Sequence, residues 1–148
     1  MSTLQTLNPA AAGGLASASD RSTKQTFIAG GAIAAGDWVA FDTTQTGVDR
    51  GLYVLEAAAV ATVGNSAAFG VALAAAAAAA QVEVCIGGYC AAANVAGAAV
   101  AGSPLIGPIG TAGEAALEAP GTTTGTVCGI ALEADTANVA AVFVIRKF

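Results

Sequence analysis

The sequence contains no histidine. Histidine is the usual general base near neutral pH, the commonest zinc ligand, and the residue that activates the nucleophile in Ser–His and Cys–His pairs. Its absence excludes these three kinds of site together. We therefore expect a protein that is not an enzyme and that holds no metal or other cofactor.

Charged residues are also scarce, at 10% of the 148 residues, and aromatic residues make up only 5%. A soluble surface usually carries about a quarter or more charged residues, so this chain must bury much of its surface or expose a bland coat of Ala, Gly and Thr. Burial in an assembly is the simplest explanation. Five basic residues and a net charge of −5 argue against a nucleic-acid partner, because phosphate binding needs clustered Lys and Arg.

Long apolar runs are missing as well. The longest, residues 67–80, is interrupted by Gly70 and falls short of the roughly 18 residues that a membrane helix requires. No secretory signal is visible, because the first basic residue is Arg21 and no continuous apolar core precedes it. We expect a protein made in the cytoplasm, without a membrane partner.

The cysteines and carboxylates suggest no reactive site. Cys85, Cys90 and Cys128 are an odd set without CxxC spacing, which fits reduced, buried thiols better than a disulfide framework. Asp37 and Asp42 flank a short apolar segment, where they are typical turn residues, and nothing resembles the dense acidic loop of a calcium site.

What the sequence does contain is a weak internal repeat. Phe-Gly-Val-Ala-Leu at 69–73 returns as Cys-Gly-Ile-Ala-Leu at 128–132, at an offset of 59 residues. Each copy leads into an alternating apolar run, at 82–86 and at 141–145. A repeated strand–turn–strand unit that carries no reactive group builds a scaffold rather than an active site.

A second pair of similar segments precedes the first. Residues 32–39 and 98–105 both combine small residues, a glycine turn and an apolar strand. From Lys24 onward, short apolar runs alternate with Gly, Thr and Asn, which is typical of strands joined by turns. Nine strands are expected, at residues 25–29, 37–41, 53–56, 68–73, 81–86, 89–93, 102–106, 126–132 and 139–145.

These strands predict a mainly β domain, either a barrel or a sandwich, over residues 25–148. Two segments favour helix instead. Seven alanines at 74–80 have the highest helix propensity, and residues 113–119 fit either a short helix or a strand that ends at Pro120. We therefore add one or two short helical turns to the β domain.

The first 24 residues differ from the rest in composition. They are rich in Ser, Thr, Ala and Gly, and their apolar anchors are Leu4, Leu7 and Leu15. Such a segment buries too little surface to order itself. It is either a disordered tail or an arm that orders on a partner, for example by adding a strand to a sheet edge with the leucines as contacts.

Trp38 and Tyr89 raise the alternative of a carbohydrate-binding or host-attachment module, since exposed aromatic rings often stack on sugars. A single Trp inside an alternating apolar strand is more often part of the core. The core interpretation is the one we favour for Trp38.

Three segments carry a resemblance to a known family. They are residues 27–39 with their Gly-Asp-Trp-Val ending, residues 70–73 with the alanines that follow, and residues 81–88. In these segments, and over about residues 25–148, the chain resembles the small head-decoration (capsid-cement) proteins of tailed bacteriophages, with the lambda-type decoration fold. The resemblance rests on pattern and composition rather than on a catalytic signature.

The resemblance implies a small β-barrel or sandwich of the β-tulip kind, with residues 1–24 as an extended arm. It implies a structural virion protein that binds the outer surface of the capsid and stabilises it, as a homotrimer at local threefold axes. The arm would grip the major capsid protein, and we expect Leu4, Leu7 and Leu15 to make those contacts. No small-molecule substrate is implied, and the protein would be made in the host cytoplasm.

Overall fold

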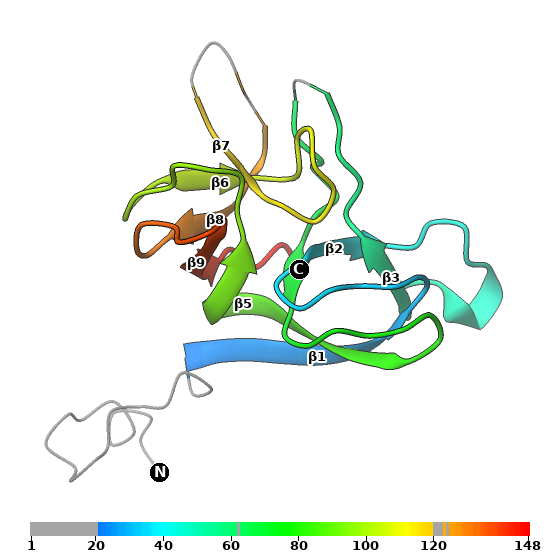
Figure 1. The fold of residues 1–148 in the computed structure, drawn as a ribbon. Helices are drawn as coiled ribbons and strands as arrows, with labels where there is room; N and C mark the ends of the chain where they lie inside the picture. The colour runs from blue at the N-terminus through cyan, green and yellow to red at the C-terminus, as the bar shows by residue number, and fades with distance from the viewer. Residues whose placement is uncertain (1–20, 62, 120–122, 124) are drawn as a thin grey trace, which may run out of the picture.

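Nine strands form one continuous sheet (Figure 1). The computed structural model describes residues 21–61, 63–119, 123 and 125–148, and none of these lies in an α-helix. A 3₁₀ turn, Gly47–Asp49, lies between β2 and β3. The strands are β1 (Ser22–Ala29), β2 (Trp38–Phe41), β3 (Tyr53–Glu56), β4 (Gly70–Ala72), β5 (Gln81–Asn94), β6 (Pro104–Ile106), β7 (Ala116–Leu117), β8 (Val127–Ala131) and β9 (Val139–Val144). The prediction of a mainly β fold is confirmed.

The first five strands close into a ring. The strand order is β1-β3-β2-β4-β5-β9-β8-β6-β7, and an additional pairing joins β1 back to β5. β1 runs parallel to β3 and antiparallel to β5, and the other neighbouring strands are antiparallel. The remaining four strands continue from β5 (Figure 1). The arrangement is ring-like, without a single barrel through all nine strands.

β5 belongs to both parts of the sheet. It spans 14 residues, where two separate strands, 81–86 and 89–93, were expected. Its first half pairs with β1 and β4, and its second half, from Gly88 on, pairs with β9. Gly88 has a φ of +85°, and a Cβ there would overlap the carbonyl oxygen of Arg21. Only glycine fits at this change of partner, so one bent strand replaces the expected pair.

The internal repeat corresponds to a repeated group of strands. In the first unit β2 pairs with β4 and β4 with β5, and in the second unit β6 pairs with β8 and β8 with β9. The two units have the same register. The matching rows of cross-strand partners are Trp38, Val71 and Cys85 in the first unit and Pro104, Ile130 and Phe143 in the second.

The turn that leads into each unit is also repeated. Gly36 and Gly102 have nearly equal φ values of +87° and +89°. Their amide N–H groups donate to the carbonyl oxygens of Ala72 and Ala131, each at 2.8 Å. A left-handed conformation of this kind favours glycine, which explains why the sequence repeats a glycine here.

The second unit is itself close to a ring. β7 pairs with β6, and Val95, just past the end of β5, forms a parallel bridge with Ala115, just before β7. In the first unit β1 occupies the corresponding place, antiparallel to β5 and parallel to β3. The second half of β5 therefore does for the second unit what β1 does for the first.

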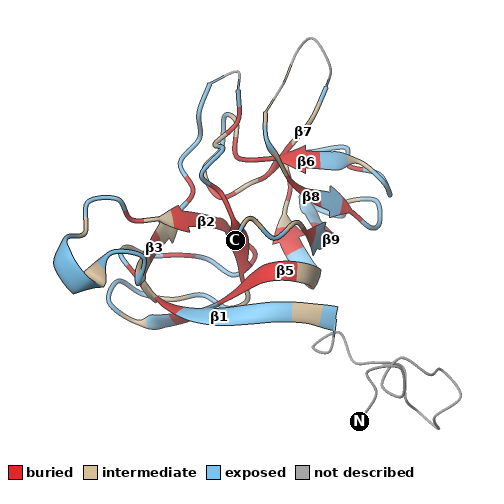
Figure 2. Cartoon of the chain, turned by 180° about the vertical axis from the view of Figure 1, so that it is seen from behind, coloured by how far each residue is buried: buried red, intermediate tan, exposed pale blue. Residues whose placement is uncertain are grey.

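Two apolar clusters stabilise the fold. One draws on all five strands of the first ring and fills it: Phe27, Ala29, Ile33, Val39, Val54, Phe69, Ala72, Val82, Val84 and Ile86. The other joins β2, β4 and β5 to β6, β8 and β9, and includes Trp38, Val71, Cys85, Leu105, Cys128, Val142 and Val144. Figure 2 shows the result, with β5 largely buried and β1 largely exposed.

The expected helical turn in the alanine run is wrong. Ala76 forms a bridge with Ile33, and each residue donates its N–H to the carbonyl oxygen of the other at 2.9 Å. A helix of seven residues is marginal by itself, so these hydrogen bonds to a neighbouring segment decide the conformation. Residues 113–119 contain β7, so the strand interpretation of that segment is the correct one.

Strand bounds agree closely with those expected in several places. β3 has the expected bounds, and β9 ends one residue earlier than expected. β1 begins at Ser22, so residues 22–24, which we assigned to the arm, lie in the sheet.

Candidate interaction surfaces

The N-terminal segment joins the described fold at Arg21. The guanidinium carbon of Arg21 lies 5.1 Å from the centroid of the Tyr89 ring, which is a cation–π contact. The expected arm contacts Leu4, Leu7 and Leu15 lie outside the described residues, so their role stays a prediction.

Trp38 belongs to the core. Its side chain is fully buried, and its Nε1–H donates to the carbonyl oxygen of Asn94 at 3.1 Å. The ring also packs over Gly129, where a Cβ would lie 2.9 Å from Cη2. The core interpretation is confirmed, and Trp38 offers no platform for a sugar. Tyr89 is half-buried and carries Arg21 over its ring.

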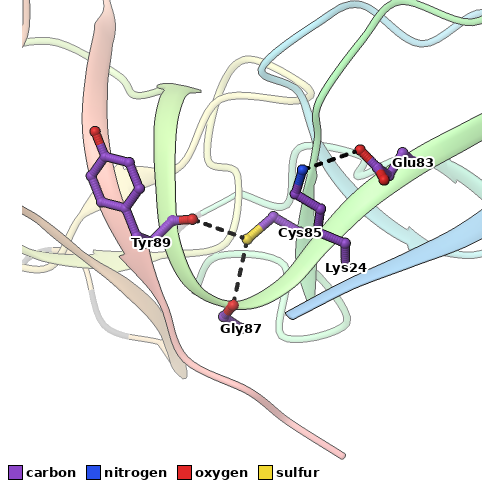
Figure 3. Close-up of polar contacts among 5 residues, drawn as sticks. All are labelled: Lys24, Glu83, Cys85, Gly87 and Tyr89. Atoms are coloured by element: carbon purple, nitrogen blue, oxygen red, sulfur yellow. Dashed lines mark hydrogen bonds and ion pairs between the residues drawn. The ribbon is translucent and has the colours of Figure 1, made fainter. Parts of the chain in front are cut away.

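All three cysteines are buried and unpaired, as expected. The Cys85 thiol donates to the carbonyl oxygens of Gly87 and Tyr89 at 3.6 Å each (Figure 3). A hydrogen bond between Cys85 and Cys90 lowers the pKa of Cys85 to about 7 and raises that of Cys90. Burial raises the pKa of Cys128 to about 12. With all three sulfurs buried, these thiols act as small core residues.

Asp42 is a turn residue, as expected. Its Oδ1 accepts hydrogen bonds from the N–H and the hydroxyl of Thr44 at 2.9 and 2.6 Å, and its Oδ2 accepts one from Gln45 Nε2 at 2.8 Å. The bond from Gln45 and those from Thr44 hold the pKa of Asp42 below its ordinary value. Both oxygens are therefore committed to the local turn.

Asp37 closes the turn before β2. Its Oδ2 accepts from the Ala34 N–H at 2.7 Å, and Asn94 Nδ2 donates to its Oδ1 at 2.8 Å. Glu56 lies on the other side of Gly113, where an added Cβ would meet both carboxylates within 3 Å. Burial, and then the negative charge of Asp37, raise the pKa of Glu56. Among the described residues, no three His, Cys, Asp or Glu gather into a metal site.

A shallow cavity of about 380 Å³ lies beside the turn of Asp42. Its lining consists of Phe41, Asp42, Thr43, Gln45, Arg50 and Gly51. Asp42 and Gln45 bond to each other, so the cavity offers few free polar groups to a ligand. In the part of the chain that the structure describes, no helix has the length and apolar character needed to cross a membrane.

The most exposed apolar side chains of the sheet lie on the second unit. Phe143 on β9 is the cross-strand partner of both Tyr89 on β5 and Ile130 on β8, and Pro104 on β6 faces Ile130. Phe143 is 47% exposed and Ile130 37%. We call Pro104, Ile130 and Phe143 the exposed row. Sequence reasoning missed it, although apolar residues on both faces of the run 139–145 are the signal that one face needs a second partner.

Comparison with known proteins gives one kind of similarity. No protein-family model matches the chain, and no curated protein sequence matches it either. Among solved structures, the fold is similar to that of the head fiber gp8.5 N base of bacteriophage phi29, with a TM-score of 0.51 and 18% sequence identity. The match covers 84% of this chain and 94% of that chain. The chain therefore shares its fold with a phage head protein, whereas the lambda-type decoration fold stays a prediction.

Proposed function

We propose that the chain is a structural virion protein that binds the outer surface of a phage capsid and stabilises it. The observation that carries the proposal is the fold shared with a head fiber base over 84% of this chain. The chemistry of the chain supports it, because a protein without histidine, with buried thiols and with Asp37 and Asp42 committed to turns, has little to offer as a catalyst.

In this proposal, three subunits assemble at a local threefold axis, and residues 1–20 of each contact the major capsid protein. Leu4, Leu7 and Leu15 are the contacts we assign. The arm starts beside Tyr89, where Arg21 is fixed by its cation–π contact, so a rigid domain holds one end of each arm. Three arms on one trimer multiply weak individual contacts through a high effective concentration.

The low charge of the chain supports a role in an assembly. Burying charged groups in an interface carries a desolvation penalty, and only 10% of these residues are charged. The carbohydrate-binding alternative loses its best candidate platform, because Trp38 is fully buried.

Co-sedimentation with purified phage heads tests the function and the arm separately. We expect the full chain to pellet with heads, and the triple variant Leu4→Ser, Leu7→Ser, Leu15→Ser to lose at least about tenfold in affinity, since apolar contacts are removed. The matched control is Ala10→Ser, Ala11→Ser, Ala12→Ser, which makes the same number of polar changes in the same segment and should pellet like the unmodified chain.

The outcomes separate the two parts of the proposal. A chain that stays in the supernatant at saturating head concentration contradicts capsid binding. A leucine variant that pellets as well as the alanine variant contradicts the arm contacts and leaves capsid binding standing. Circular dichroism of each variant verifies that the β domain is folded.

A further inference from the structure

The two units of the repeat differ in how one equivalent row of side chains is covered. In the first unit Trp38, Val71 and Cys85 are all 0% exposed. The second unit covers this row: Trp38 packs over Gly129, and the row belongs to one apolar cluster with residues of β6, β8 and β9. The first unit therefore shows what an apolar row at this place in the strand group requires.

The matching row of the second unit has no cover among the described residues. Phe143 occupies the place of Cys85, Ile130 that of Val71, and Pro104 that of Trp38. All three residues are exposed. Leu132 and Val139 extend the apolar surface at 44% and 37% exposure. A contiguous apolar patch of this kind on a sheet marks an interaction site.

Charges of opposite sign lie at the two ends of this patch. Arg21 and Arg146 lie near the end of β9 at which Val144 faces Gly88. Glu133 and Asp135 lie in the loop between β8 and β9, where Glu133 Oε1 accepts the N–H of Ala141 at 2.9 Å.

The separation of the two ends matters for electrostatics. Val139 and Val144 bound β9, so the ends are about 17 Å apart at about 3.3 Å per residue. That exceeds the screening length of about 8 Å at physiological salt, so each end presents its own charge. The patch is thus apolar in the middle, basic at one end and acidic at the other.

We propose that the exposed row is the contact surface for a second copy of this chain. The basic end of one copy, with Arg21 and Arg146, then lies beside the acidic end of the next, with Glu133 and Asp135. The inference rests on the proposed function, which requires self-association, and it names the surface that mediates it.

A second copy fits better than the other available occupants. It supplies both signs of charge, whereas residues 1–20 contain a single charged side chain, Asp20, and cannot complement both ends. It also supplies a strand group of the type that already covers the equivalent row within one chain. Surfaces that complement copies of themselves are what closed homo-oligomers use.

The test is the solution mass of the full chain, measured by sedimentation velocity without phage heads. We expect the unmodified chain to have the mass of three subunits and Phe143→Ser to have the mass of one at the same concentration. The matched control is Val48→Ser, since Val48 is 95% exposed and lies in the 3₁₀ turn between β2 and β3. It should assemble like the unmodified chain.

A charge variant makes the test independent of the Phe143 side chain. Arg146→Glu should weaken assembly at least about tenfold, and adding Asp135→Arg should recover most of it. If Phe143→Ser does not fold, as judged by circular dichroism, this pair of variants decides the outcome.

Three results would overturn the inference, and they are distinguishable. Assembly that survives both Phe143→Ser and Arg146→Glu shows that the surface lies elsewhere. Dissociation caused only by deleting residues 1–20 shows that the arm links the copies. A monomeric unmodified chain rejects self-association as a whole, and if that monomer still pellets with heads, capsid binding stands without it.

Discussion

Trp38 is the residue that joins the two units of the molecule. It lies on β2 of the first unit, is fully buried, and packs over Gly129 on β8 of the second. Its indole N–H finds a partner in the carbonyl oxygen of Asn94, so the side chain brings a large apolar area into the core without leaving a polar group unpaired.

We predict that Trp38→Ala lowers the free energy of unfolding by about 3–5 kcal/mol, as expected when a buried large aromatic side chain leaves a cavity. Urea denaturation followed by circular dichroism measures the change. Tyr89→Ala is the comparison, because Tyr89 is only half-buried and should cost less. A loss below about 1 kcal/mol for Trp38→Ala would show that the two units do not depend on this contact.

A second prediction at this scale concerns Glu56 and pH. Burial and the charge of Asp37 raise the pKa of Glu56 above its ordinary value of 4.5. A carboxyl group whose pKa is raised by folding destabilises the fold when it ionises, so stability present at low pH is lost as the pH rises through the folded pKa. Glu56→Gln should therefore have a higher Tm than the unmodified chain at pH 7 and the same Tm at pH 3.5.

The control for this prediction is Glu83→Gln. Glu83 makes an exposed ion pair with Lys24 at 3.5 Å (Figure 3), and its loss should change Tm little at either pH. Calorimetry at both pH values provides the comparison. An equal or lower Tm for Glu56→Gln at pH 7 would contradict the raised pKa.

Among the elements, the strands were predictable wherever apolar and polar residues alternate between turn residues, as in β3. The alanine run was not, because its high helix propensity is a local property, whereas the hydrogen bonds between Ala76 and Ile33 join segments far apart in sequence. The bend of β5 was also beyond local reasoning, since the space around Gly88 depends on where β1 lies.

Two glycines test the role of β1 in closing the first ring. Gly88 and Gly51 both have a left-handed φ, of +85° and +76°, but a Cβ on Gly88 would overlap the Arg21 carbonyl, whereas nothing lies within 4 Å of Gly51. We predict that Gly51→Ala costs about 1 kcal/mol from backbone strain, and that Gly88→Ala costs more and separates β1 from β5.

Hydrogen exchange gives the measurement. In Gly88→Ala the amides of β1 that face β5, around Phe27, should lose protection, while those of β8 and β9 keep theirs. Equal effects of the two substitutions would mean that the pairing of β1 with β5 tolerates a side chain at the bend.

At the scale of the whole molecule, the internal repeat was the part of the sequence that predicted most. The matching segments proved to be β4 with β8 and β5 with β9, and the glycine turns proved to be equivalent at Gly36 and Gly102. The candidate surface was not predictable in the same way. An alternating run shows that a strand has two faces, but only the packing of the two units shows that the row of Phe143 is left uncovered.

The predicted arm contacts are a separate case. Leu4, Leu7 and Leu15 stand out by composition alone, and the structure describes the chain only from Arg21. Their assignment therefore depends on binding experiments. The same holds for the trimer, which rests on the resemblance and on the exposed row.

The most direct test of the central claim is electron cryomicroscopy of phage heads with and without the purified chain. We predict additional density on the outside of the capsid at local threefold positions, with a shape that the nine-strand fold fits. Heads that remain bare at saturating concentrations of the chain would contradict a role as a capsid-binding virion protein.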